Sequence, residues 1–327
     1  MINIAVIGCG KSAGQYRLPE IEVNPSFNLV AVYDIVSQRA EETAKQYGVR
    51  HCTTLEEILE DKGIDAICVC TPNASHRDIT IKAQHSGKHV LCQAPISSNL
   101  QHALEMMDHS RTSGKVFMIA HQRRYLPAYR EAKKILSSKK LGKVLNFNIV
   151  LAAEKPKTRD CMDIWTFRNE SFAYGVAIDL GVEATDLFIH LVGFLNETTA
   201  FANCIEDKLQ DGTFVWVFNA ITCAMKSVEV QGTVAVSWLN NPDTEESFTL
   251  LCENGILRVK DGSLETTYID GVTTRHSLPD DTVTVVDAFA DAILNDGAHS
   301  TAADGYQALR RIIASLESSR IKRAVLI

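Results

Sequence analysis

Hydrophobic residues in the first third of the chain form short apolar runs separated by segments of helix length. The runs Ile2 to Ile7, Ile64 to Cys70 and Val116 to Ala120 are apolar at nearly every position, which is typical of strands buried on both faces of a parallel sheet. Between them, segments such as Ser37 to Tyr47 have helical spacing and end near a glycine. This alternation predicts right-handed βαβ units and an α/β fold with a parallel sheet.

The pattern changes after residue 121. A long helix is expected from Gly175 to Val192, and the chain ends in two helical segments. From about residue 200 to 268, short apolar runs follow one another without helices, and Asn254-Gly255 and Asp261-Gly262 are hairpin signals. These strands are therefore expected to be antiparallel. We expect two domains, 1–121 and 122–327, since 327 residues exceed one ordinary core.

The first predicted strand runs directly into a glycine-rich turn with the pattern G-x-G-x-x-A, which consists of Gly8, Cys9, Gly10, Lys11, Ser12 and Ala13. In such a turn the first glycine permits the tight bend and the second lets backbone amides approach a pyrophosphate. The phosphates then lie at a helix N-terminus, where unpaired amides point towards them. The turn predicts a dinucleotide site, and the alternative is an ordinary tight turn in an α/β domain.

A carboxylate at the end of the second strand strengthens this prediction. Asp34 follows the apolar run Leu29 to Tyr33, at the distance where an acidic residue binds the adenosine ribose hydroxyls. Ile35 and Val36 come next, so no basic residue is immediately available for a 2′-phosphate, and NAD is favoured over NADP. Arg39 leaves NADP open, and it is alternatively a stacking partner for adenine.

Composition narrows the class of partner. Apolar residues make up 46% and charged residues 22%, as in globular proteins, and the net charge of -7 argues against non-specific nucleic-acid binding. No leader pattern and no apolar run of 18 residues is present, so we expect a cytoplasmic protein without a membrane partner. Nine scattered cysteines without a Cys-x-x-Cys pair indicate reduced core thiols, not disulfides or structural zinc.

Several motifs occur together in a recognisable order. They are the turn Gly8 to Ala13, Thr71-Pro72-Asn73 with His76, Gln93-Ala94-Pro95, Arg123-Arg124-Tyr125 with Pro127, and Asp179-x-x-x-Glu183-x-x-Asp186. With them the chain resembles the Gfo/Idh/MocA family of sugar and cyclitol oxidoreductases over almost its whole length. The resemblance implies an N-terminal Rossmann domain and a C-terminal α+β domain whose open, mostly antiparallel sheet packs against another subunit. It also implies a homodimer or homotetramer, and a nicotinamide located between the domains.

The resemblance also assigns contacts to individual residues. It implies that Thr71, Pro72 and Asn73 pass beside the nicotinamide and its ribose, that His76 contacts cofactor or substrate, and that Gln93 keeps a hydrogen bond to the cofactor. Regions that shape the substrate pocket in the family correspond here to Tyr125, Trp165 and Arg168. A structural role is the alternative for His76 and for each of these three pocket residues.

The chain departs from the family where the chemistry takes place. The usual Glu-Lys-Pro motif, whose lysine helps to move a proton, is Gln93-Ala94-Pro95 here, and Ala94 cannot titrate. On the long helix Asp179 matches the family's aspartate, but the usual histidine is replaced by Glu183. Two of the three usual proton-handling groups are thus absent.

Acidic residues on the long helix offer a substitute. Asp179, Glu183, Asp186 and His190 are spaced to share one helical stripe, and only the first two are placed to serve one reacting atom. Two adjacent carboxylates raise one pKa and leave the other group ionised, so Glu183 is the candidate base and Asp179 its partner. The alternative is that Glu183 is a solvated or salt-bridged replacement. A metal is disfavoured because about three converging ligands are required, and His190 is expected to be a packing residue.

These observations leave three classes of function. The first is an NAD-dependent oxidoreductase acting on a sugar, cyclitol or related polar metabolite, or one reducing a C=C or C=N bond. The second is a lyase, hydrolase, isomerase or hydratase that holds NAD tightly without net redox. The third is a binding or regulatory protein that binds NAD but has no activity.

Overall fold

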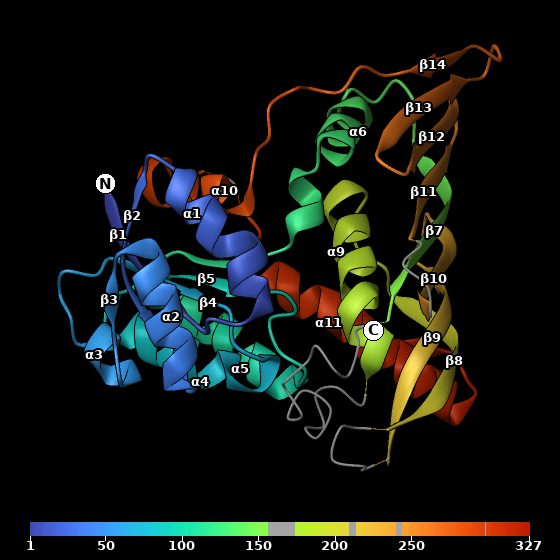
Figure 1. The fold of residues 1–327 in the computed structure, drawn as a ribbon. Coiled ribbons are helices and arrows are strands. Elements are labelled where there is room, and N and C mark those ends of the chain that lie inside the picture. The colour runs from blue at the N-terminus through green and yellow to red at the C-terminus, as the bar shows by residue number, and fades with distance from the viewer. Residues whose placement is uncertain (156–173, 209–213, 240–243, 298) are drawn as a thin grey trace. The chain divides into compact units, whose positions relative to one another are not determined.

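The computed structural model describes residues 1–155, 174–208, 214–239, 244–297 and 299–327. The chain divides into two compact units. The first contains Met1–His121 and Thr284–Tyr306, and the second contains Gln122–Val283 and Gln307–Ile327. Each unit is built on one β-sheet (Figure 1).

The first unit has a six-stranded sheet in the order β3-β2-β1-β4-β5-β6, and all of its pairs are parallel. In this order, β2 and β3 are added on one side of β1, and β4, β5 and β6 on the other side. It is the strand order of the Rossmann fold and confirms the predicted fold class. The strands are buried between helices, which explains their continuous apolar sequences. Their bounds are β1 Ile2–Ile7, β2 Phe27–Tyr33, β3 Arg50–His51, β4 Ala66–Val69, β5 His89–Gln93 and β6 Phe117–Ala120.

Helices alternate with these strands as the sequence pattern predicts. They begin with a π-helical turn, η1 (Ala13–Arg17), and continue with α1 (Leu18–Val23), α2 (Ser37–Tyr47), α3 (Leu55–Leu59), α4 (Asn73–His85) and α5 (Leu100–Ser110). A late segment, α10 (Val285–Asn295), returns to this unit. There the ring of Phe289 stacks on Phe27 at a centroid distance of 5.8 Å, and Asn24 donates a hydrogen bond of 2.6 Å to Asp287.

The second unit has a nine-stranded sheet in the order β14-β13-β12-β11-β7-β10-β9-β8-β15. The pairs among the strands between residues 197 and 268 are antiparallel, as predicted. The earlier strand β7 lies between β10 and β11, parallel to the first and antiparallel to the second, so the sheet is mixed but mostly antiparallel. The bounds are β7 Val144–Glu154, β8 Glu197–Lys208, β9 Phe214–Lys226, β10 Gln231–Leu239, β11 Glu245–Cys252, β12 Gly255–Lys260, β13 Ser263–Tyr268, β14 Thr273–Arg275 and β15 Val325–Leu326.

Two hairpins of this sheet lie at or next to the predicted turn signals. Asp261 and Gly262 connect β12 to β13, with φ angles of 45° and 77°, as a type I′ turn requires. The loop between β11 and β12 is shifted by one residue from the Asn-Gly pair. It consists of Glu253 and Asn254, while Gly255 begins the next strand and pairs with Cys252.

Helices of the second unit pack on one face of its sheet (Figure 1). On β7 the alternating residues Phe147, Ile149 and Leu151 are buried, which gives this face an apolar core. The helical segments are η2 (Gln122–Tyr125), α6 (Pro127–Ser137), η3 (Ala177–Gly181), α9 (Val182–Leu191) and α11 (Ala302–Ile321), of which the last begins in the first unit. Among the described helices, none is both long enough and apolar enough to cross a membrane.

Candidate functional site

The glycine-rich turn of the first unit has two glycines with different requirements. Gly8 has a φ angle of 92°, and a Cβ atom there would lie 2.8 Å from the carbonyl carbon of Cys70. A Cβ on Gly10 would have no atom within 4 Å. Gly8 is thus required for packing of the turn against β4, whereas Gly10 faces open space in which a phosphate group can approach the backbone.

Asp34 links this turn to the end of β2. Its Oδ2 atom accepts a hydrogen bond of 2.7 Å from the backbone amide of Cys9, and its Oδ1 atom accepts one of 2.8 Å from the amide of Val36. Both oxygens keep further acceptor capacity, which suits ribose hydroxyls. Burial raises the pKa of the Cys9 thiol to about 12, although Arg39 and a hydrogen bond with Thr43 oppose the shift, so this thiol stays protonated at neutral pH.

The loop after β4 is fastened by a buried histidine. His76 has no exposed surface, and its Nε2 atom lies 2.7 Å from the carbonyl oxygen of Thr71. Its Nδ1 atom lies 3.2 Å from the carbonyl oxygen of Pro95 and 3.3 Å from that of Ile96. Burial lowers the pKa of His76, against the effect of these carbonyl groups. Both ring nitrogens therefore face backbone oxygens, and the side chain joins the loops that follow β4 and β5.

Gln93, at the end of β5, connects with the glycine-rich turn. Its Nε2 atom donates a hydrogen bond of 2.8 Å to the hydroxyl of Ser12, and its Oε1 atom accepts one of 3.3 Å from Arg17. Arg17 is buried and also pairs with Glu20 at 2.6 Å. Arg17 could not be predicted as part of this network, because a cation in the first helical segment has no local sequence signature. These hydrogen bonds attach the glycine-rich turn to the end of β5. The side chain of the adjacent Ala94 has no polar atom that could join this network.

The first unit thus fits a bound dinucleotide. It provides a glycine turn with room for a pyrophosphate, a carboxylate at the ribose position, and polar side chains at the ends of neighbouring parallel strands, where α/β sheets bind ligands. The other predicted contact residues are partly exposed on these same loops; they are Lys11, Thr71, Pro72 and Asn73.

In the second unit, Asp179 lies in the π-helical turn η3 that opens the predicted long helix. Its Oδ2 atom accepts a hydrogen bond of 3.0 Å from the indole nitrogen of Trp238, a largely buried residue of β10. Desolvation raises the pKa of Asp179, and the nearby charge of Glu183 adds to this, while Trp238 and Arg123 oppose it. Such π-helical turns are frequent at functional sites.

Glu183, at the start of α9, belongs to a charged network. Its Oε2 atom lies 3.8 Å from Nε of Arg123, and Arg123 also forms an ion pair with Glu246 on β11. Tyr129 donates a hydrogen bond of 2.6 Å to Glu246. Burial disfavours the charge of Arg123, but Glu246 and Glu183 outweigh this and raise its pKa. Glu246 lies 63 residues beyond Glu183 with no motif around it, so this contact could not be predicted from the sequence.

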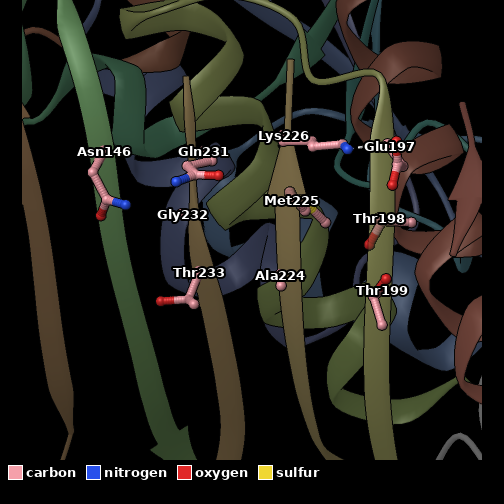
Figure 2. A pocket seen from close by; sticks show the side chains of 10 residues that line it. All are labelled: Asn146, Glu197, Thr198, Thr199, Ala224, Met225, Lys226, Gln231, Gly232 and Thr233. Carbon is pink, nitrogen blue, oxygen red and sulfur yellow. Dashed lines mark ion pairs between the residues drawn. The ribbon is translucent and has the colours of Figure 1, made fainter. Parts of the chain in front are cut away.

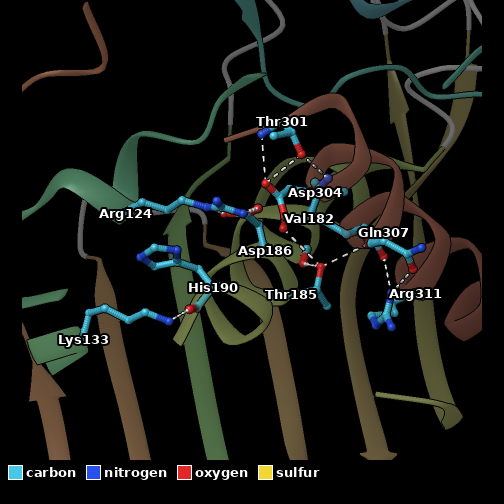
Figure 3. Close-up of polar contacts among 12 residues, drawn as sticks. Arg124, Lys133, Val182, Thr185, Asp186, His190, Thr301, Asp304, Gln307 and Arg311 are labelled. Atoms are coloured by element: carbon cyan, nitrogen blue, oxygen red, sulfur yellow. Dashed lines mark hydrogen bonds and ion pairs between the residues drawn. The ribbon is translucent and has the colours of Figure 1, made fainter. Parts of the chain in front are cut away.

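The remaining polar residues of the predicted stripe have other partners (Figure 3). Asp186 is buried and accepts two hydrogen bonds from Arg124, of 2.8 and 2.5 Å. The backbone carbonyl of His190 accepts a hydrogen bond from Lys133. This end of the helix is therefore attached to η2 and α6. Of the three acidic residues of the stripe, Asp179 is exposed, Glu183 is partly exposed and Asp186 is buried.

Of the predicted substrate residues, Tyr125 is half-buried in η2, while Trp165 and Arg168 lie outside the described residues. In the described part of the chain, no group of three or more histidine, cysteine or acidic side chains is arranged to hold a metal ion. A separate hollow of about 260 Å³ lies along strands β7 to β10 of the second unit (Figure 2). It is lined by polar and small residues, such as Asn146, Gln231 and Thr233, and contains none of the predicted site residues.

A Rossmann unit with a dinucleotide turn, joined to a sheet unit with adjacent carboxylates, defines the class of two-domain dinucleotide-dependent oxidoreductases. Residues 2–121 match the family model described as the oxidoreductase family with an NAD-binding Rossmann fold, and residues 129–258 match the GFO/IDH/MocA C-terminal domain. The chain belongs to the Gfo/Idh/MocA family.

The curated relatives include dehydrogenases that act on a cyclitol or a sugar derivative. An NADP-dependent scyllo-inositol 2-dehydrogenase of Bacillus subtilis is 26% identical over 282 residues, which cover 81% of this chain and 82% of that protein. A levoglucosan dehydrogenase of Pseudarthrobacter phenanthrenivorans is 26% identical over 49% of this chain and 42% of its own length. A solved levoglucosan dehydrogenase in complex with NADH and levoglucosan has a TM-score of 0.87 at 20% identity, and the match covers 100% of this chain and 99% of that one.

Proposed function

We propose that this protein is an NAD-dependent oxidoreductase that acts on a sugar, cyclitol or related small polar metabolite. The observation that carries the proposal is the pair Asp179 and Glu183, two neighbouring carboxylates with different partners in the sheet unit. Support comes from the family and from relatives that act on such substrates. Asp34, with no basic residue directly after it, favours NAD, although some relatives use NADP.

The two carboxylates have different roles in proton transfer. Glu183, whose Oε2 atom lies 3.8 Å from Nε of Arg123, is assigned as the acceptor of a substrate hydroxyl proton. Asp179 has a raised pKa and is held by Trp238, so it orients a substrate hydroxyl and carries the proton more readily than an ordinary aspartate. The cofactor, when bound, accepts or supplies the hydride.

Ala94 supports a second candidate function. An alanine in place of the family's lysine removes the group that usually accompanies hydride transfer at a carbinol carbon. A lyase, hydrolase, isomerase or hydratase that retains NAD without net redox has less need of that lysine. Loss of one general acid or base lowers a rate by about 10²- to 10⁴-fold, which leaves net oxidation feasible.

The test begins with the nucleotide that denaturation releases from purified protein, followed by absorbance of reduced nicotinamide in the presence of polyols, sugar acids and aminosugars. We expect exchangeable NAD that becomes reduced by one of these substrates. Glu183→Gln should lower kcat by at least about 100-fold, and Glu229→Gln, an exposed glutamate paired with Lys143, should not. Turnover with no absorbance change would favour the non-redox function, and an unchanged Glu183→Gln variant would refute the assigned base.

We further propose that the open face of the second sheet joins copies of this chain into a homodimer or homotetramer. Phe201 and Trp216, on the paired strands β8 and β9, are 78% and 64% exposed. Apolar side chains of this size on a sheet face are typical of a buried interface. Sedimentation should show an oligomer that Trp216→Glu dissociates, and a wild-type monomer would refute this.

A further inference from the structure

Two histidines on neighbouring helices of the first unit bring their ring nitrogens together. His85 is the last residue of α4 and His109 lies near the end of α5, and their Nε2 atoms are 2.7 Å apart. The ring planes are nearly perpendicular, at 83°, and the centroids are 4.3 Å apart. Neither residue belongs to the dinucleotide turn or to the carboxylate pair.

A hydrogen-bond chain sets which nitrogen of His109 carries a lone pair. The buried Gln84 donates from Nε2 to the hydroxyl of Ser113, which directs its Oε1 atom towards Nδ1 of His109 at 3.1 Å. Oε1 can only accept, so Nδ1 of His109 donates and its Nε2 atom carries the lone pair. This lone-pair nitrogen is the one that lies 2.7 Å from Nε2 of His85. A carbonyl oxygen behind a ligating imidazole is the usual support of a metal-binding histidine.

The spacing of the rings is close to that of two ligands on one metal ion. Imidazole nitrogens bound at about 2.0–2.1 Å with a right angle between them are about 2.9 Å apart. A straight N–H···N hydrogen bond of the observed length would separate the ring centroids by about 5 Å. The observed 4.3 Å is shorter, so the rings are bent relative to each other, as chelation requires.

We propose that His85 and His109 chelate one late divalent transition-metal ion that accepts ligands at a right angle, such as Ni²⁺ or Cu²⁺, with water completing its coordination. Imidazole is a preferred ligand of these ions. Since no third histidine, cysteine or carboxylate joins the pair in the described part of the chain, the site is open and exchangeable. A bound ion links α4 to α5, and it stabilises the folded unit because the unfolded chain does not hold the two rings together.

The probe is NiCl₂, titrated calorimetrically into the untagged full-length protein under reducing conditions. We expect one site per chain, at least 10-fold weaker binding in His85→Gln and in His109→Gln, and wild-type affinity in the control His102→Gln, another histidine of α5. Ni²⁺ should raise the melting temperature of the wild type and of the control only. Circular dichroism checks that each variant folds.

Removal of the supporting amide gives a second measurement. Gln84→Met keeps the side-chain volume but removes the acceptor behind His109, and should weaken Ni²⁺ binding by about 10- to 100-fold while both histidines remain. Equal affinity in the wild type, His85→Gln and His109→Gln would overturn the proposal. So would binding that persists in both variants and disappears after the thiols are alkylated, because the ion would then be on cysteine.

Discussion

Replacement of each glycine of the dinucleotide turn by alanine should affect a different property: stability at Gly8 and NADH affinity at Gly10. Gly8→Ala places a methyl group 2.8–2.9 Å from three backbone atoms of Cys70 and Thr71, at a φ angle of 92°. Strain at such a backbone angle costs about 1–3 kcal/mol, and overpacking costs about another 1–3 kcal/mol. We therefore expect Gly8→Ala to lower the free energy of unfolding by about 2–6 kcal/mol. This is a large part of the about 5–15 kcal/mol by which a typical protein is stable.

Gly10→Ala should leave stability within about 0.5 kcal/mol of the wild type, because no atom lies within 4 Å of the added methyl group. The methyl group does occupy the space into which a pyrophosphate approaches. NADH affinity should therefore fall by at least about 10-fold, which corresponds to about 1.4 kcal/mol. Urea denaturation measures the free energy of unfolding, and titration of NADH fluorescence measures the NADH affinity.

Gly14→Ala is the matched control, since its added methyl group also meets open space but the residue lies outside the glycine motif. It should retain both stability and NADH affinity. If Gly10→Ala bound NADH as tightly as the wild type, the cofactor phosphates would not pass over this turn. A Gly8→Ala variant of normal stability would show that the contact with β4 is not required.

Three further outcomes follow from the polar contacts. Trp238→Phe removes a hydrogen-bond donor that lowers the pKa of Asp179, so the acidic limb of the kcat/KM pH profile should move to higher pH, and an unmoved limb would show that Asp179 is not the group titrating. Asp186→Asn breaks a buried ion pair and should lower the free energy of unfolding, measured by urea denaturation, by about 3–5 kcal/mol. Asp281→Asn, at an exposed ion pair, should lower it by less than about 1 kcal/mol, and equal losses in the two variants would contradict this. Asp34→Asn removes the charge that repels a 2′-phosphate, so the ratio of NADH to NADPH affinity should fall by at least about 10-fold, and an unchanged ratio would count against its ribose role.

Local signals in the sequence were sufficient for most elements of the fold. The range of α2 from Ser37 to Tyr47 follows from helical spacing and a terminal Gly48 in the left-handed region, both of which act within a few residues. The parallel pairing of β7 with β10 has no such signal, because strands about 85 residues apart in the chain pair through tertiary packing.

In the candidate site too, residues in a local motif could be predicted from the sequence, whereas contacts between distant elements could not. The glycine turn and Asp34 could be predicted as cofactor contacts from the sequence, because close approach to a phosphate and a ribose requires particular residues at fixed spacing. The sequence did not reveal the contact of Trp238 with Asp179 or the pairing of Glu246 with Arg123, since each joins residues from different elements. The convergence of His85 and His109 is similar, because it depends on how two helices pack.

The return of α10 to the first unit has a consequence for the order of events during synthesis. More than 260 residues separate Phe27 from its stacking partner Phe289 in the chain, and a similar number separate Asn24 from Asp287. Both contacts can therefore form only late in synthesis. The parallel sheet is completed much earlier, by residue 120. The nascent Rossmann unit therefore spends most of translation with one apolar surface exposed, which is a condition under which chaperones bind and premature aggregation begins.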